Sequence, residues 1–162
     1  MSVTANAQVW AACTCVLYGK MLLTTTIQGG KTFRAGGRPP EDSKLSIAKN
    51  FKGVKQNYGL VPADAKDVKL LQAKETEHRW RRIVANDIET IPIALLVFAA
   101  GVLTNANETV HLGAMVVFTA IRCWHTYAYA HSLQPQRAIA WSLGHLAALV
   151  GAGNVVLSLL LA

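Results

Sequence analysis

The sequence predicts an all-α membrane protein that folds as a four-helix bundle. The chain has 162 residues, a length that one domain accommodates, and 52% of them are hydrophobic. These residues come in long blocks, each long enough for a helix to cross a bilayer, which is unlike an ordinary soluble domain. We expect one integral membrane domain over residues 1–162, with helices at about 7–28, 75–104, 109–130 and 136–161.

The first apolar block, residues 7–28, contains a single charged residue, Lys20. A signal peptide is the alternative, but no basic segment precedes the block and residues 24–28 are not a small-residue cleavage site. We therefore expect a retained first helix that ends at Gly29-Gly30. Lys20 either snorkels to the surface or faces the bundle, and the sequence leaves both open.

Residues 29–74 are predicted to form a long basic loop, which holds ten of the sixteen Lys and Arg residues. Nothing in the chain resembles a nucleic-acid-binding module, and the apolar blocks favour a membrane interpretation of the charge. A loop this long is uncommon unless it packs, binds or moves. Its charge predicts that it faces the cytoplasm, or the matrix in a mitochondrion. Pro40-Glu41-Asp42 is expected to open a short turn or helix.

The later connectors agree with four spans that place both termini on one side. Residues 105–108 carry no Lys or Arg, as expected on the side opposite the basic loop. Residues 131–136 are a short link, so the third and fourth helices should be antiparallel neighbours. Small residues that permit close helix contact recur every fourth position in the last helix: Gly144, Ala148 and Ala152, and also Ala147 and Gly151.

Polar residues form one stripe on the second helix, where a charged segment runs into an apolar one. Arg82, Asn86 and Glu89 are spaced i, i+4 and i+7, which places them on one face. Such groups are costly at a membrane edge unless they meet partners or a polar ligand. Pro92 lies later in the same helix and is expected to kink it or rearrange one turn.

A second stripe is predicted at the same membrane end. Arg122, His125 and Tyr129 share one face of the third helix, and Arg137 opens the fourth. Three arginines against one carboxylate favour a site for a small polar anion. The alternative is an interhelical hydrogen-bond network with snorkelling arginines. No His or carboxylate pair has convincing metal spacing, and no metal is expected.

Four short motifs occur in order between residues 39 and 141. They are Pro40-Glu41-Asp42, Arg82-x-x-x-Asn86-Asp87-x-Glu89, Arg122-x-x-His125-Thr126-x-Ala128-Tyr129 and Leu133-x-Pro135-Gln136-Arg137. Together they resemble the MAPEG family, the membrane-associated proteins of eicosanoid and glutathione metabolism. The resemblance is strongest to the branch of microsomal glutathione transferases and prostaglandin E synthases.

The resemblance implies a homotrimer of four-helix subunits that binds glutathione, its co-substrate, between subunits. It implies that six residues bind glutathione: Arg82, Asn86, Glu89, Arg122, His125 and Tyr129. Arg137 would be the catalytic arginine that holds the sulfur as thiolate, and Asp42 a further contact from the first loop. Ala138 and Trp141 depart from the prostaglandin synthases, where serine and often tyrosine are expected, so the resemblance does not specify the substrate.

The resemblance implies a membrane-bound glutathione transferase, with peroxidase activity as an option, acting on lipophilic electrophiles or lipid hydroperoxides. The alternative is a non-catalytic subunit that keeps the fold and docks on other membrane subunits through the basic loop. The lipid bilayer is an expected partner in either case, and nucleic acid is not. The sequence leaves the endoplasmic reticulum and the mitochondrion open as locations.

Overall fold

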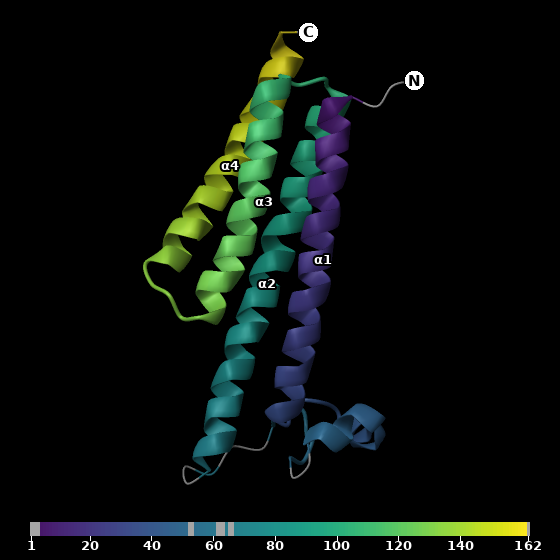
Figure 1. Ribbon diagram of the computed structural model, residues 1–162, viewed down its shortest axis with the longest axis vertical. Helices are drawn as coiled ribbons and strands as arrows, with labels where there is room; N and C mark the ends of the chain where they lie inside the picture. The colour runs from purple at the N-terminus through teal and green to yellow at the C-terminus, as the bar shows by residue number, and fades with distance from the viewer. Residues whose placement is uncertain (1–3, 52–53, 61–63, 65–66, 162) are drawn as a thin grey trace. The chain divides into compact units, whose positions relative to one another are not determined.

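A computed structural model describes residues 4–51, 54–60, 64 and 67–161 of the chain. Four long α-helices dominate it: α1 (Ala5–Arg34), α2 (Val68–Leu103), α3 (Glu108–Ala130) and α4 (Gln136–Leu160) (Figure 1). Two 3-10 helices, η1 (Pro40–Lys44) and η2 (Ser46–Phe51), follow α1. The described residues include no strand, which confirms the all-α prediction.

The first two helices are longer than the sequence suggested. The prediction that Gly29-Gly30 ends the first helix is wrong, because α1 continues to Arg34. A glycine costs a helix only about 1 kcal/mol relative to alanine, and the last turn is held by the buried side chains of Thr32 and Phe33. Helix α2 begins at Val68 rather than near residue 75, since the side chain of Asp67 accepts a hydrogen bond from the Leu70 amide at 3.0 Å.

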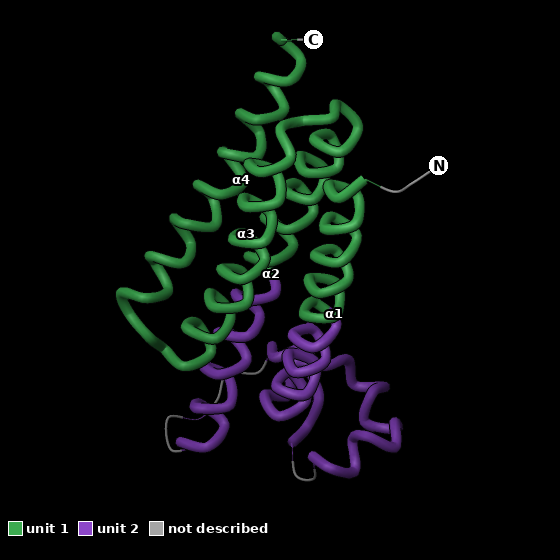
Figure 2. The backbone as a smooth tube through the Cα atoms, turned by 45° about the horizontal axis from the view of Figure 1, so that its top comes forward, with its two compact units in different colours: residues 1–21, 85–162 green, residues 22–84 purple. Residues whose placement is uncertain are grey.

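The chain divides into two compact units (Figure 2). Unit 1 contains residues 1–21 and 85–162, and unit 2 contains residues 22–84. Helices α1 and α2 each contribute to both units. Helix α2 continues through Pro92, which lies in unit 1.

Unit 1 is a helix bundle with a core drawn from all four helices. Helix α1 begins and α4 ends at the same end of this unit (Figure 1), as an even number of spans requires. Polar side chains join the helices near that end: the Asn6 amide donates to the Ala106 carbonyl at 3.2 Å, and the Asn154 amide donates to the Asn107 carbonyl at 3.0 Å. The buried core consists of Cys13, Leu17, Ile91, Ala94, Phe98, Ala114, Met115, Phe118 and Ala147.

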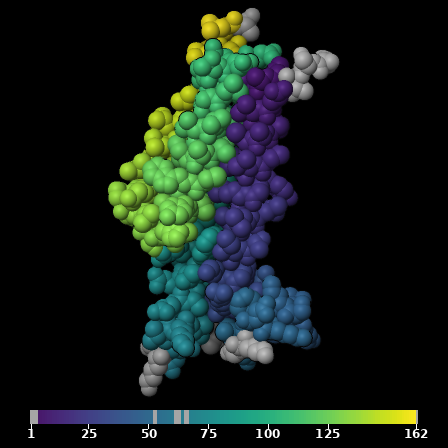
Figure 3. Space-filling model, in the orientation of Figure 1, coloured from purple at the N-terminus to yellow at the C-terminus, as the bar shows by residue number. Residues whose placement is uncertain are grey.

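Helices α3 and α4 lie side by side as antiparallel neighbours (Figures 1 and 3). Small residues on α4 make this packing close, and Gly144, Ala147 and Gly151 are buried. A Cβ atom at Gly144 would lie 3.5 Å from Cγ2 of Ile121 on α3. A Cβ atom at Gly151 would lie 2.6 Å from Cε1 of Phe98 on α2, closer than real Cβ contacts allow. The predicted role of small residues in helix contact is therefore confirmed at these positions.

Two helices, α2 and α4, are long and apolar enough to cross a membrane by length and composition. Their most apolar windows are only 28% and 22% buried, so most of this apolar surface faces outward, unlike the core helix of a soluble protein. Helices α1 and α3 also expose apolar side chains, among them Val16 and Val117. These two helices do not reach the same hydropathy, and α1 carries Lys20 while α3 carries Arg122.

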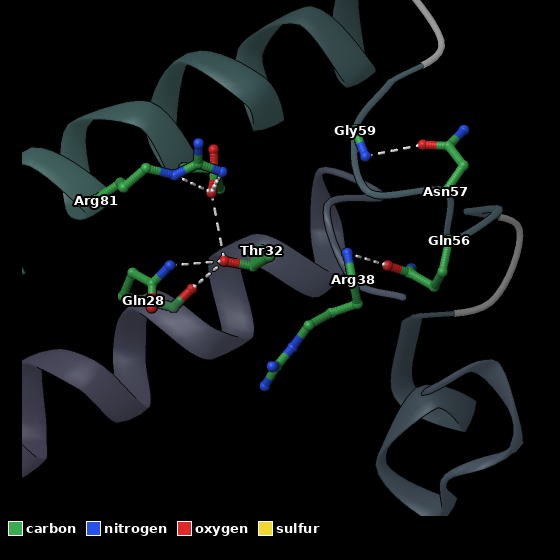
Figure 4. A network of polar contacts seen from close by, with 8 residues as sticks. Gln28, Thr32, Arg38, Gln56, Asn57, Gly59 and Arg81 are labelled. Carbon is green, nitrogen blue, oxygen red and sulfur yellow. Dashed lines mark hydrogen bonds and ion pairs between the residues drawn. The ribbon is translucent and has the colours of Figure 1, made fainter. Parts of the chain in front are cut away.

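Unit 2 is organised around the buried side chain of Gln56 (Figure 4). Its amide nitrogen donates to the Phe33 carbonyl at 2.9 Å, and its amide oxygen accepts from the Arg38 backbone amide at 3.1 Å. The rings of Phe33 and Phe51 stack with centroids 5.4 Å apart, which packs η2 against α1. The expected turn at Pro40-Glu41-Asp42 is confirmed as η1.

Candidate functional site

Three buried ionic groups from three helices meet in unit 1. Oδ1 of Asp87, on α2, lies 2.6 Å from Nη2 of Arg122, on α3. Oδ2 of the same carboxylate lies 2.5 Å from Nζ of Lys20, on α1. The side chains of Arg122 and Asp87 are 0% and 1% exposed, and that of Lys20 is 9% exposed. One carboxylate therefore serves two cations, and the cluster keeps a formal charge of +1.

Arg122 also orders the side chain of Asn86. Its Nη2 donates to Oδ1 of Asn86 at 3.0 Å and to the Asn86 carbonyl at 3.3 Å. Nε and Nη1 of Arg122 have no hydrogen-bond partner within the described part of the chain. A Cβ at Gly144 would lie 3.8 Å from Cδ of Arg122, so α4 passes close to the arginine. Arg122 is thus a positive charge enclosed by α2, α3 and α4.

A pocket of about 290 Å³ lies beside this cluster. Its volume is at the lower end of the range for ligand-binding cavities, which is roughly 300–1,000 Å³. Among the described residues that line it, Arg137 is the one charged side chain, and its guanidinium carbon lies 4.6 Å from the Tyr129 ring centroid. The rings of His125 and Tyr129 meet edge to face at 5.8 Å. The lining residues are Asn86, His125, Tyr129, Gln134, Arg137, Ala138, Trp141 and Ser142. Because the described lining has an arginine and no carboxylate, the pocket favours an anion.

Four of the site residues named from the sequence line this pocket: Asn86, His125, Tyr129 and Arg137. Arg122 lies behind the pocket and reaches it through Asn86. Glu89 belongs to unit 1 but is exposed and does not line the pocket.

The two remaining named residues lie in unit 2. Arg82 is exposed there. Asp42 lies in η1, with its carboxylate 3.8 Å from Nε of Arg38. Their predicted contacts with glutathione stay predictions.

Sequence reasoning missed four residues of this region. Asp87 and Lys20 belong to the buried cluster with Arg122, and Gln134 and Ser142 line the pocket. Asp87 lies about 100° around the helix from Asn86 and so falls outside the Arg82, Asn86 and Glu89 stripe. The available signal was Lys20, the only charge in its apolar block, which needs a carboxylate partner if it faces the bundle.

Fold and site together define an integral membrane protein of the four-helix type with a positively charged pocket. The sequence matches the family model of the MAPEG family over residues 9–157. This match covers most of the chain and reaches all four helices, and the chain belongs to the MAPEG family. A search of curated proteins found no match. Membership of this family fits a membrane glutathione transferase or a related function.

Proposed function

We propose that the protein is a membrane-bound, glutathione-dependent transferase or peroxidase that acts on lipophilic electrophiles or lipid hydroperoxides. The observation that carries the proposal is the convergence of Asn86, His125, Tyr129 and Arg137 on one pocket. Glutathione has two carboxylates and one ammonium, so its net charge suits a pocket with one arginine and no carboxylate. The enclosed positive charge of Arg122 behind Asn86 adds to this attraction.

Arg137 has the central chemical role in this proposal. Its guanidinium stabilises the glutathione thiolate, which is the nucleophilic form of the thiol. In conjugation, the thiolate sulfur forms a bond to the electrophilic carbon as the leaving group departs with its electron pair. In hydroperoxide reduction, the hydroperoxide becomes an alcohol and water, while two glutathione molecules become the disulfide. The outward apolar surfaces of α2 and α4 give lipophilic substrates access from the bilayer.

The exposure of Glu89 supports a glutathione site shared between subunits, as in the proposed homotrimer. Its carboxylate is exposed on α2 between Ile88 and Ile93, which are 56% and 64% exposed. No ion pair of Glu89 occurs among the residues that the structure describes. A carboxylate on such an apolar face is costly in a membrane unless a neighbouring subunit or the ligand ammonium covers it. We assign Glu89 to that shared part of the site.

The charge distribution supports a cytoplasmic or matrix position for unit 2. Residues 22–84 contain thirteen of the sixteen Lys and Arg and six of the nine Asp and Glu, so they account for the whole net charge of +7. Positive segments beside membrane spans stay on the cytoplasmic side. We therefore propose a multi-pass protein of the endoplasmic reticulum or a mitochondrial membrane, with its basic unit on that side.

The direct test uses the purified full chain in detergent. Binding of isotopically labelled glutathione is measured together with conjugation of an aromatic electrophile and reduction of a lipid hydroperoxide. We expect glutathione binding together with at least one of the two activities, and loss of activity in Arg137→Ala. Absence of glutathione binding in the wild type, or full activity in Arg137→Ala, would overturn the proposal.

A second candidate is a non-catalytic subunit of a larger membrane complex. The strongly basic unit 2 favours it, because such a unit can dock on an acidic partner. The mass of the gently solubilised particle separates the two candidates. Three copies of this chain support the enzyme, whereas stoichiometric purification with other chains and no response to glutathione supports the structural role.

A further inference from the structure

A second pocket, of about 240 Å³, lies within unit 2, between the end of α1 and the start of α2. It shares no residue with the pocket proposed for glutathione. Lys31 and Arg34 come from the last turn of α1, and Lys69 comes from the first turn of α2. The lining residues are Lys31, Arg34, Lys69, Gln72, Ala73 and Thr76. The described lining of this small space therefore holds three cations and no carboxylate.

The cations of this pocket have no carboxylate partner among the described residues. Within the described ranges, none of Lys31, Arg34 and Lys69 forms an ion pair. The two carboxylates next in sequence to Thr76 are engaged elsewhere. Glu77 accepts from Arg81 at 2.6 Å, and Glu75 lies 3.5 Å from Arg79. Since like charges that converge repel one another, the pocket is complementary to an anion from outside the chain.

Contacts beside the pocket hold its two walls together (Figure 4). The Thr32 hydroxyl, next to Lys31, lies 3.4 Å from Oε1 of Glu77, next to Thr76. The same hydroxyl is joined to Gln28, one turn earlier, by an amide donor at 2.9 Å. Thr32 and Glu77 are both buried, so these contacts hold α1 and α2 together beside the pocket.

The chemistry of the lining favours a phosphate group over a single carboxylate. Phosphate carries up to two negative charges and several acceptor oxygens, so it can contact three cations together. The Gln72 amide adds a neutral donor, and the volume leaves room for an ester group on the phosphate. In a membrane protein, a basic unit beside the spans meets anionic headgroups of the facing leaflet.

We propose that Lys31, Arg34 and Lys69 form a phosphate-binding site that takes either the headgroup of an anionic lipid or a soluble phosphate compound. The shared chemistry is a phosphate oxyanion clamped by three cations from two helices. The site is separate from glutathione binding, and its test does not require that the protein be an enzyme.

Native mass spectrometry of the full chain in detergent tests the proposal. One arm offers equal amounts of short-chain phosphatidic acid and phosphatidylcholine, and a second arm measures the thermal shift caused by inorganic phosphate. The pocket variant combines Lys31→Gln, Arg34→Gln and Lys69→Gln. The control variant combines Lys44→Gln, Lys49→Gln and Lys55→Gln, which removes the same charge from exposed lysines of unit 2 outside the pocket.

We expect the wild type and the control variant to retain phosphatidic acid over phosphatidylcholine, and the pocket variant to lose this preference by about tenfold. A phosphate-induced thermal shift that is lost only in the pocket variant, without lipid preference, supports a soluble phosphate source. Equal loss in both variants, or no binding of either probe to the wild type, overturns the proposal. If the pocket variant fails to fold, Lys69→Gln alone is used, because this side chain is exposed.

Discussion

Oδ1 of Asp87 lies 2.6 Å from Nη2 of Arg122, and both side chains are shielded from solvent within unit 1. The carboxylate also binds Lys20 at 2.5 Å, so Asp87 is the one negative charge between two buried cations. Breaking such a cluster by removing one member leaves an uncompensated charge in a low-dielectric interior. The cluster therefore matters for stability whatever ligand the adjacent pocket takes.

The first prediction concerns Asp87→Asn. This substitution leaves Lys20 and Arg122 without their shared counter-ion, and we expect a loss of about 3–5 kcal/mol in the free energy of unfolding. Unfolding of the detergent-solubilised protein by heat or denaturant measures it. The matched variant Asp87→Asn with Lys20→Met removes one of the stranded cations and should recover part of the loss. Equal stability of wild type and Asp87→Asn would contradict the buried cluster.

The second prediction concerns helix contact at Gly151. A methyl group there would lie 2.6 Å from Cε1 of Phe98, so Gly151→Ala should destabilise the bundle by about 1–3 kcal/mol. Gly153→Ala is the control, because nothing lies within 4 Å of its added Cβ. The control should be neutral or stabilising by up to about 1 kcal/mol, since alanine is the better helix former. Thermal unfolding of both variants gives the comparison, and indistinguishable results would refute the close packing.

The third prediction separates Gln134, in the turn before α4, from Gln136, the first residue of α4. Gln134 lines the pocket, whereas Gln136 does not. Loss of one neutral hydrogen bond is worth about 0.5–1.5 kcal/mol, so Gln134→Ala should weaken glutathione binding by about twofold to tenfold. Gln136→Ala should bind like the wild type. Equilibrium binding of labelled glutathione measures both, and equal affinities would remove Gln134 from the site.

The fold class and four side chains of the pocket were predictable because they depend on local features, which are helix periodicity and the length of the links. Spacings of three, four and seven residues placed His125 with Tyr129 on one face, and the short link before Arg137 brought α4 beside α3. The role of Lys20 was not predictable. Whether Lys20 is exposed or buried depends on whether Asp87 of α2 lies opposite Lys20, and no local sequence pattern predicts that contact.

The bounds of the first two helices differ from expectation for a related reason. Glycine is only a weak helix breaker, and the packing of Thr32 and Phe33 in unit 2 outweighs Gly29-Gly30. Likewise, the lining of the second pocket combines residues from the end of α1 and the start of α2, almost forty positions apart. These lining residues are brought together by the tertiary contact between Thr32 and Glu77, which the composition of the sequence does not predict.

The central claim is that Arg137 holds glutathione as its thiolate in the pocket of unit 1. Difference absorbance of the thiolate near the ultraviolet edge, recorded at saturating glutathione, tests it most directly. We predict a thiolate signal in the wild type and its loss in Arg137→Ala, while labelled glutathione still binds the variant. Arg137→Lys, which keeps the charge but not the planar guanidinium, should retain part of the signal. A wild type that binds glutathione without thiolate, or an unchanged signal in Arg137→Ala, would contradict the account.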